Sequence, residues 1–257
     1  MTEAQLPDEA RLPIAFAVAT GHEAQIVQRA LIAAGANCPQ PGPQTSHQSN
    51  PPAKPRYDFE VVRTGVGCCA LDAATFINKY SAIVSTGFAG ALGPGIECGS
   101  LLLPGQVRKS DTASYDVDPA LQRLITMNAP TTVVEGPLFQ TDLLLATAAE
   151  KQRAHGDSLC IACDMESALL AQAGKQSELP FACLRIVLDT AEMTIPDPIA
   201  DLADTSSHSD PSAAEFLKSL MRHPRQLPST AVFLWHLSKA SRALSRSVSR
   251  LIEGSYQ

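Results

Sequence analysis

Three acidic side chains stand directly after strands that the sequence predicts. Glu23 follows the apolar run LPIAFAVAT, Glu166 lies in DMESALLAQ after the run SLCIAC, and Asp189 ends the run PFACLRIVLD. In an open α/β sheet, the turns at the carboxyl ends of the strands converge on one crevice, where ligands bind. We therefore expect these carboxyl groups to meet. Such a set suits cleavage of a bond at a sugar carbon, because the cation-like transition state needs an acid for the leaving group and a base for the nucleophile.

Other common chemistries of α/β proteins find no support in the sequence. It lacks a G-x-S-x-G nucleophile elbow, a G-x-x-x-x-G-K-[ST] phosphate loop and a G-x-G-x-x-G dinucleotide fingerprint. Cys160 and Cys163 form a C-x-x-C pair, but no second pair and no suitably spaced His accompany them. We read them as buried structural thiols. The sequence therefore predicts neither a metal ion nor a resident cofactor.

The elements that must position the acids alternate along the chain. Buried strands are predicted over 12–20, 57–65, 81–87 and 180–189, and helices over 21–35, 67–80, 141–156 and 164–177. We expect Thr141 or Asp142 to cap the third of these helices. Strands that alternate with helices indicate a three-layer α/β fold with a largely parallel sheet.

The chain divides by composition into a body and two less regular parts. Residues 1–11 are expected to be a disordered N-terminus, and residues 12–200 an α/β domain. Within that domain, the Pro-rich segment 37–56 has little to bury and is expected to be a mobile loop. Residues 201–257 are expected to form a helical extension, with helices at about 212–222 and 228–252.

Charge and hydropathy limit the partners and the compartment. The net charge is −6, yet residues 218–252 hold seven of the 20 basic residues and no acid, so 13 basic and 26 acidic residues remain elsewhere. An acidic body argues against nucleic-acid binding. The sequence shows no signal-peptide pattern, and its apolar runs are shorter than the roughly 20 residues of a spanning helix. We expect a cytoplasmic protein.

Three stretches together resemble the purine nucleosidases and nucleoside phosphorylases, a family that includes methylthioadenosine/S-adenosylhomocysteine nucleosidase. They are VSTGFAGALGPGIECGSLLLP, DMESALLAQ and PFACLRIVLDTAE, and the resemblance spans roughly residues 12–192 in the family's order. It implies the three-layer phosphorylase/hydrolase-like fold with a mixed sheet. It also implies an enzyme that cleaves the N-glycosidic bond of a purine nucleoside.

The resemblance assigns roles to the acids. Glu166 would hydrogen-bond the ribose hydroxyls, with Met165 packing beneath the sugar. Asp189 would bond the purine and help to protonate its N7, which makes the base a better leaving group. Glu23 would orient or deprotonate the attacking water.

The glycine-rich loop would contribute backbone to the substrate site. Ala89 and Gly90 would line the base pocket, because small residues let a flat ring approach closely. Thr86 and Gly87 belong to the same substrate-binding stretch. The family often has Ser before the catalytic aspartate, whereas this chain has Leu188, so the hydrogen bond that orients the acid is missing or replaced.

Water is favoured over phosphate as the nucleophile. The family's phosphorylases carry a Gly-Asp-Pro-x-Arg motif near the first strand and an Arg before the glycine-rich loop, and this chain has TGHEAQ and SAIVSTG there. His22 and Arg63 are the residues left to form an anion site, so phosphorolysis, with phosphate as co-substrate, stays an alternative. A non-catalytic nucleoside-binding protein is the second alternative, because FQTDLL lacks the aromatic residue found in many nucleosidases.

The C-terminal extension bears on the substrate. In a helix over 228–252, an apolar face runs from Leu234 to Leu251 and a basic face from Lys239 to Arg250. Such a helix suits peripheral contact with the inner membrane face, a partner protein, or packing on the domain's own core. The basic tail and CDMES together resemble the hopanoid-associated branch of the family, which acts on adenosylhopane, an adenosine with a triterpene at its 5′ carbon. This resemblance implies a lipid-linked purine nucleoside as substrate and, since relatives often dimerise, a homodimer.

Overall fold

The computed structural model describes residues 12–36, 57–71, 75–110, 113–130, 133–205 and 212–255. The expected disordered N-terminus, residues 1–11, and the expected mobile loop, residues 37–56, lie outside the described residues.

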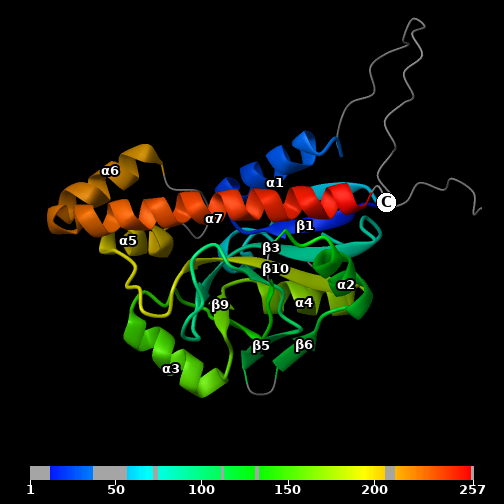
Figure 1. Cartoon of the computed structure of the whole chain (residues 1–257), viewed down its shortest axis with the longest axis horizontal. Coiled ribbons are helices and arrows are strands. Elements are labelled where there is room, and N and C mark those ends of the chain that lie inside the picture. The colour runs from blue at the N-terminus through cyan, green and yellow to red at the C-terminus, as the bar shows by residue number, and fades with distance from the viewer. Residues whose placement is uncertain are drawn as a thin grey trace, which may run out of the picture.

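A ten-stranded sheet forms the middle of the molecule (Figure 1). Its strands are β1 (Ile14–Val18), β2 (Phe59–Arg63), β3 (Ala82–Ala91), β4 (Leu101–Leu102), β5 (Gln106–Ser110), β6 (Ala113–Asp116), β7 (Val133–Val134), β8 (Leu138–Gln140), β9 (Ala162–Asp164) and β10 (Phe181–Asp189). The neighbouring pairs β3–β9, β4–β10 and β5–β6 are antiparallel, and the other pairs are parallel. The predicted fold, with a mixed and largely parallel central sheet, is confirmed.

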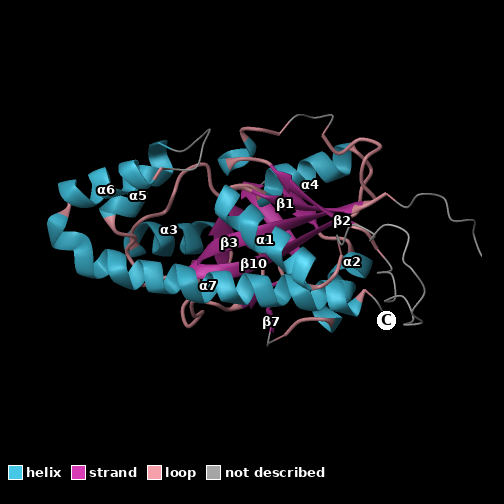
Figure 2. Ribbon diagram, turned by 90° about the horizontal axis from the view of Figure 1, so that it is seen from above, coloured by secondary structure: helices cyan, strands magenta, loops and turns pink. Residues whose placement is uncertain are grey.

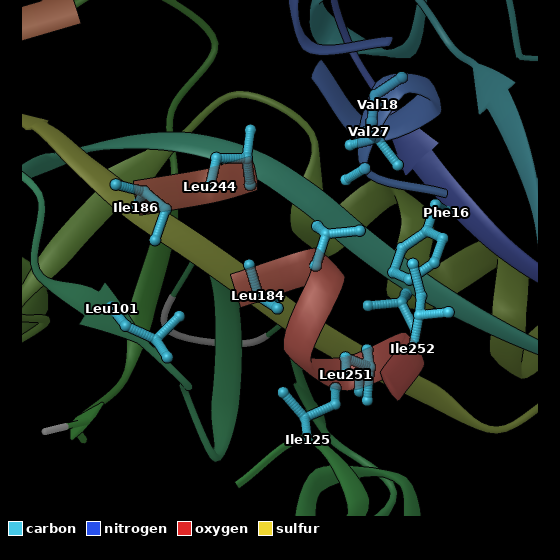
Figure 3. Close-up of a cluster of buried hydrophobic side chains, with 14 of the residues drawn as sticks. Phe16, Val18, Val27, Leu101, Ile125, Leu184, Ile186, Leu244, Leu251 and Ile252 are labelled. Atoms are coloured by element: carbon cyan, nitrogen blue, oxygen red, sulfur yellow. The ribbon is translucent and has the colours of Figure 1, made fainter. Parts of the chain in front are cut away.

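Helices cover both faces of this sheet (Figure 2). They are α1 (Gly21–Ala33), α2 (Pro119–Met127), α3 (Ala148–Ser158), α4 (Ser167–Gln176), α5 (Asp197–Thr205), α6 (Ala213–Arg222) and α7 (Leu227–Gly254). Because side chains alternate along a strand, each central strand feeds two cores. Phe16 and Leu184 pack beneath α1 and α7, as Figure 3 shows, whereas Ala17 and Cys183 pack beneath α4.

Strand β3 changes its neighbour on one edge, and this change opens the sheet. Up to Ser85 that edge pairs with β1, and from Gly90 onward it pairs with β9. The other edge pairs with β10 along its length. Among the described strands, none pairs with the first edge between Ser85 and Gly90. Backbone groups in that interval are available to side chains, at the same end of the sheet as the predicted acids.

Helix α7 contributes to the main core with its C-terminal half. Leu244, Val248 and Leu251 are buried in the same cluster as β1 and β10, while Arg242 and Arg246 are exposed. Of the three readings that the sequence left open for this amphipathic helix, packing on the domain's own core holds for this half. No helix in the described ranges is both long and apolar enough to cross a membrane.

Two helix predictions need correction. The segment predicted as a helix over 67–80 has only the short 3₁₀ turn Val66–Cys68 in its described part, because Gly67, Cys68 and Asn78 have positive φ angles that no right-handed helix accepts. The helix predicted from residue 141 begins at Ala148, after the cap Thr147. Thr141 and Asp142 therefore do not cap it, and Thr141, Leu144 and Leu145 line the cavity described below.

A projection formed by α5, α6 and the first half of α7 extends beyond the sheet (Figures 1 and 2). Large apolar side chains are exposed on it, with Met221 at 68% and Trp235 at 58% of their full exposure. Phe233, by contrast, is buried. Helix α7 therefore buries its apolar face in its C-terminal half but exposes apolar side chains in its N-terminal half.

Candidate active site

A cavity of about 870 Å³ lies at the carboxyl ends of the central strands. Its volume falls within the range of small-molecule sites, about 300–1,000 Å³. Glu23, Glu166 and Asp189 all line it. The strand-end argument therefore brought together three acids that are far apart in the sequence.

Glu23 is held at the cavity by the start of α1 and the open edge of β3. Its Oε2 accepts hydrogen bonds from the backbone and the hydroxyl of Thr20, at 2.9 and 3.0 Å, in a capping box. Its Oε1 accepts a hydrogen bond of 2.9 Å from the Phe88 N–H, on the edge of β3 that lacks a strand partner. The acid caps its helix and also presents its carboxylate to the cavity, so the two roles coexist.

Glu166 sits between β9 and α4, where the Gly67 N–H donates to its Oε1 at 3.0 Å. The irregular turn that replaces the predicted helix therefore directs a backbone donor at this acid. Burial, helped by the nearby charges of Asp164 and Glu23, raises the pKa of Glu166 to about 8. Its carboxyl group therefore exchanges a proton close to neutral pH.

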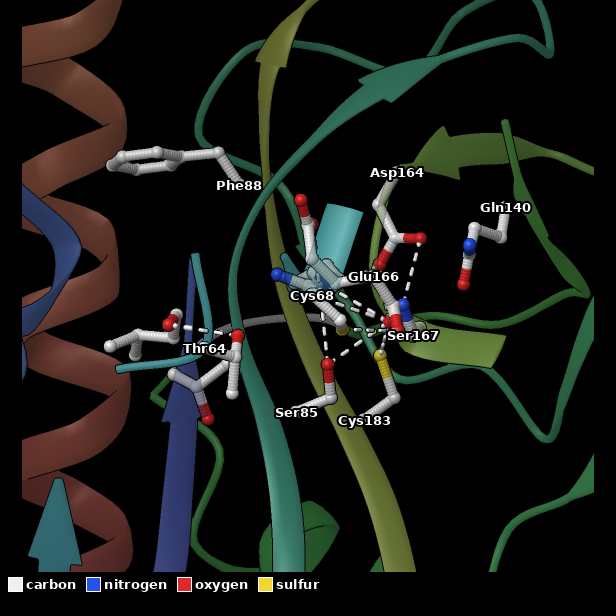
Figure 4. Close-up of polar contacts among 12 residues, drawn as sticks. Thr64, Cys68, Ser85, Phe88, Gln140, Asp164, Glu166, Ser167 and Cys183 are labelled. Atoms are coloured by element: carbon white, nitrogen blue, oxygen red, sulfur yellow. Dashed lines mark hydrogen bonds and ion pairs between the residues drawn. The ribbon is translucent and has the colours of Figure 1, made fainter. Parts of the chain in front are cut away.

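Arg185 is a site residue that the sequence analysis missed. It is 1% exposed in the middle of β10, and its Nη2 lies 2.7 Å from Asp164 Oδ2 and 4.0 Å from Glu166 Oε2. Ser85 and Ser167, which Figure 4 shows close to Glu166, accept hydrogen bonds from the Arg185 guanidinium at 2.7 and 2.9 Å. Burial alone would lower the pKa of Arg185, but the carboxylates of Asp164 and its neighbours raise it, so the guanidinium stays charged.

Gly87 leaves space that the side chains of Glu23 and Arg185 occupy. A Cβ atom at this position would collide with the carboxylate of one and the guanidinium of the other. The absence of a side chain at this glycine therefore leaves room for the side chains of Glu23 and Arg185.

Asp189 lines the cavity where β10 ends. A bulge at Leu188 shifts the register so that Asp189 pairs with Gly90, and a Cβ at that glycine would lie 3.0 Å from the Asp189 carboxylate. Lys151 Nζ lies 2.5 Å from Asp189 Oδ2. Burial raises the pKa of Asp189, and the ammonium of Lys151 opposes that effect. The residue before Asp189, Leu188, has no donor, and the Lys151 ammonium is the charged group in contact with the acid.

The far end of the cavity is apolar and reaches the projection. Helices α5, α6 and α7 and the segment before α3 all contribute to it. Its apolar lining residues include Leu144, Leu145, Ile195, Ile199, Leu202, Phe216, Phe233, Leu234 and Leu237.

Six of the eight residues assigned by the family resemblance line the cavity: Glu23, Ala89, Gly90, Met165, Glu166 and Asp189. Gly87 does not line it but leaves the space described above. Thr86 does not reach the cavity, because it is fully buried and its hydroxyl donates to the Val84 carbonyl at 3.1 Å. Within the described part of the chain, no cluster of His, Cys, Asp or Glu could hold a metal ion.

Comparisons with known proteins give a consistent picture. The family model described as the Phosphorylase superfamily matches residues 13–222. Among curated proteins, the 5′-methylthioadenosine/S-adenosylhomocysteine nucleosidase of Shewanella sediminis is 26% identical over 164 residues, which are 54% of this chain and 71% of that protein.

Solved structures share the fold. The 5′-methylthioadenosine/S-adenosylhomocysteine nucleosidase of Neisseria meningitidis, in complex with methylthio-immucillin-A, superposes with a TM-score of 0.59 at 18% identity, over 94% of this chain and 98% of that one. The futalosine hydrolase of Helicobacter pylori superposes with a TM-score of 0.57 at 19% identity, over 82% and 98% of the two chains. At such low identities the structural likeness establishes the fold alone.

Proposed function

Because the chain belongs to the Phosphorylase superfamily, we propose that it is a purine nucleosidase, which hydrolyses the bond between a purine and its ribose. The observation that carries this proposal is the arrangement of its acids in one cavity. Glu23, Glu166 and Asp189 all line it, and the charged Arg185 lies 4.0 Å from Glu166 Oε2. The names of its relatives, which include two kinds of nucleoside hydrolase, support the same class of reaction.

Asp189 is the acid for the leaving base. A protonated carboxyl group donates to N7 of the purine, so the base departs neutral as the glycosidic bond lengthens. Gly90 leaves space beside this carboxyl group for a flat ring. Burial favours the protonated form of Asp189, which suits a proton donor.

Glu166 and Glu23 serve the ribose and the water. In its ionised form, whose fraction grows as the pH rises towards its pKa of about 8, Glu166 accepts hydrogen bonds from the ribose hydroxyls, which become better donors as positive charge develops on the sugar. Glu23 accepts a proton from the water that attacks the sugar carbon. The guanidinium of Arg185 lies 4.0 Å from Glu166 Oε2, and its charge also acts on Glu23.

Phosphorolysis is the alternative that the pocket disfavours. A phosphate at the sugar face would lie beside the carboxyl groups of Glu23 and Glu166, which repel it when ionised. Arg185 is already paired with Asp164 at 2.7 Å. The alternative keeps support from His22 and Arg63, which line the same cavity. The third reading, an inert nucleoside-binding protein, loses ground because Lys151 supplies the partner that Leu188 lacks.

The substrate that we propose is a 5′-substituted adenosine with a large apolar substituent, for which adenosylhopane is the best candidate. The support is the apolar end of the cavity, where Ile199, Phe216 and Phe233 extend the site away from the acids. Burial of apolar surface favours binding by about 25 cal/mol per Å². An unsubstituted nucleoside would leave these walls without contacts.

A screen of base release tests the reaction and the substrate together. We expect release of adenine without added phosphate, and kcat/KM should rise from adenosine through methylthioadenosine to adenosines with longer 5′-alkyl groups. Inosine tests whether the enzyme accepts a purine base other than adenine. Strict dependence on phosphate would select the phosphorylase alternative. Rapid cleavage of methylthioadenosine with no activity on 5′-lipid adenosines would contradict the lipid substrate, and no release from any nucleoside would overturn the nucleosidase proposal.

Peripheral membrane contact is the second part of the proposal, and the projection is the surface that suits it. Leu217 and Trp235 expose apolar side chains there, and Lys218, Arg222 and Arg225 lie on the same projection. Basic residues near an anionic bilayer each favour binding by about 1 kcal/mol. A lipid-linked substrate would then pass from the bilayer into the apolar end of the cavity.

Fluorescence of Trp235, the single tryptophan of the chain, reports this contact. We expect a blue shift with phosphatidylglycerol vesicles and none with phosphatidylcholine vesicles. Reversing the charges of Lys218, Arg222 and Arg225 to Glu should abolish the shift. The matched control reverses Arg242, Arg246 and Arg250, which lie on the other half of α7, and should retain it. A shift that grows with protein concentration without vesicles would instead assign this surface to the homodimer, which is otherwise still a prediction.

A further inference from the structure

Lys151 is a buried cation to which the family resemblance assigns no role and which takes no part in the proposed proton transfers. It lies in α3, in the polar stretch AAEKQRAHG, and is 0% exposed. Its ammonium group contacts Asp189 Oδ2 at 2.5 Å, the Thr190 carbonyl at 2.8 Å and the Met193 carbonyl at 2.7 Å. All three partners belong to the end of β10 and the loop after it.

The three contacts match the three hydrogens of an ammonium group. A lysine ammonium has three donors and no acceptor, so each hydrogen has one oxygen here. A neutral amine would leave one buried oxygen without a donor, which costs free energy. The three oxygens therefore take up all three hydrogens of the ammonium group, and one of these oxygens belongs to Asp189.

We propose that Lys151 is the positioning residue of the catalytic acid: it holds the Asp189 carboxyl group in place and, through Thr190 and Met193, ties the loop after β10 to it. This inference rests on the proposed function, in which Asp189 protonates the base. The side chain before Asp189 is Leu188, which has no donor, so orientation must come from another element. Helix α3 supplies it from about 40 residues earlier in the chain.

The same lysine connects the acid to the substrate-selecting end of the cavity. The loop that it holds continues to Ile195, whose N–H donates to the Ala146 carbonyl at 2.7 Å, just before α3. Ile195 lines the apolar part of the cavity. One helix and its leading segment thus anchor both ends of the loop between the acid and α5.

Charge at Lys151 also sets the pH range in which Asp189 can donate a proton. The titratable groups that act on Asp189 or are acted on by it are Lys151, His236, Cys98 and Cys163. Of these, the Lys151 ammonium is the cation in direct contact. Without this ammonium group, less opposes the effect of burial on Asp189, so the pKa of Asp189 rises. Because the carboxyl group must carry a proton to act, the basic limb of kcat/KM should then move to higher pH.

The experiment compares Lys151→Met with the parent protein. We expect kcat to fall by about 10²-fold, as for a small misplacement of a catalytic group, and the basic limb of kcat/KM to move to higher pH. The matched control is Lys175→Met, at an exposed lysine in the last turn of α4, which should leave both unchanged. A parental kcat and an unmoved limb in Lys151→Met would overturn the proposal.

Two further variants keep the test independent of folding and of the substrate. Lys151→Met/Asp189→Asn removes both charges, so its thermal midpoint should lie above that of Lys151→Met alone. Lys151→Arg keeps the charge and should keep the limb near its parental position, even with a lower kcat. If the shift in thermal midpoint of the double variant equalled the sum of the shifts of Lys151→Met and Asp189→Asn, the pairing would be overturned. If the parent releases no base, the nucleosidase proposal fails, and the midpoints still decide whether Lys151 and Asp189 act as a pair.

Discussion

Replacing Asp189 with Asn is expected to lower kcat for base release by about 10²- to 10⁴-fold, the range for loss of a general acid. An amide can still donate a hydrogen bond to the purine, but it cannot transfer a proton to N7. Binding should suffer less than catalysis, because the amide oxygen can still accept from Lys151. Steady-state measurement of adenine release gives both kcat and KM.

The control for this prediction is Asp157→Asn, an exposed aspartate on α3. It makes the same chemical change outside the cavity and should retain parental kcat. Thermal melting of both variants separates loss of the acid from loss of the fold. If Asp189→Asn kept more than a tenth of the parental kcat while folded, Asp189 would not be the proton donor.

Replacing Arg185 with Met is expected to lower the free energy of unfolding by about 3–5 kcal/mol, the usual cost of removing one partner of a buried ion pair. Methionine fills part of the space but leaves Asp164 without its cation, which lies 2.7 Å away in the parent. Urea unfolding, followed by circular dichroism, gives the free energy directly.

The matched control is Arg123→Met, on the exposed face of α2, where the expected change is within about 0.5 kcal/mol. The double variant Arg185→Met/Asp164→Asn should recover part of the lost stability, because it removes the unpaired charge as well. Equal losses in Arg185→Met and Arg123→Met would show that the buried cluster does not stabilise the fold.

The sequence predicted the place of Glu23 and Asp189 because β1 and β10 run parallel to β3, and the carboxyl ends of parallel strands converge. Glu166 also reaches the cavity, but it follows β9, which is antiparallel to β3, so its place depends on that pairing. Thr86 was assigned on the family pattern alone. Its side chain is fully buried and donates to the Val84 carbonyl, and the cavity lining in β3 begins only at Phe88.

Arg185 and Lys151 were missed for different reasons. Arg185 interrupts the apolar strand PFACLRIVLD, and a charge in such a run requires buried partners, so a signal was present in the sequence. Lys151 had no signal, because its neighbours are polar and typical of a solvated helix. Its burial depends on how the loop after β10 folds over α3, which no local pattern encodes. The failed helix over 67–80 likewise depends on a distant acid, Glu166, which binds the Gly67 N–H.

Helix α7 belongs both to the main core and to the wall of the cavity. Its last turns complete the main core, and Phe233 and Leu237 near its start form a wall of the cavity. Trimming the protein from that end would therefore unfold it before it changed the choice of substrate. Helices α5 and α6 contribute no described residue to the three buried clusters. Evolution can remodel those two helices to fit molecules of another size, while the scaffold that carries the chemistry stays intact.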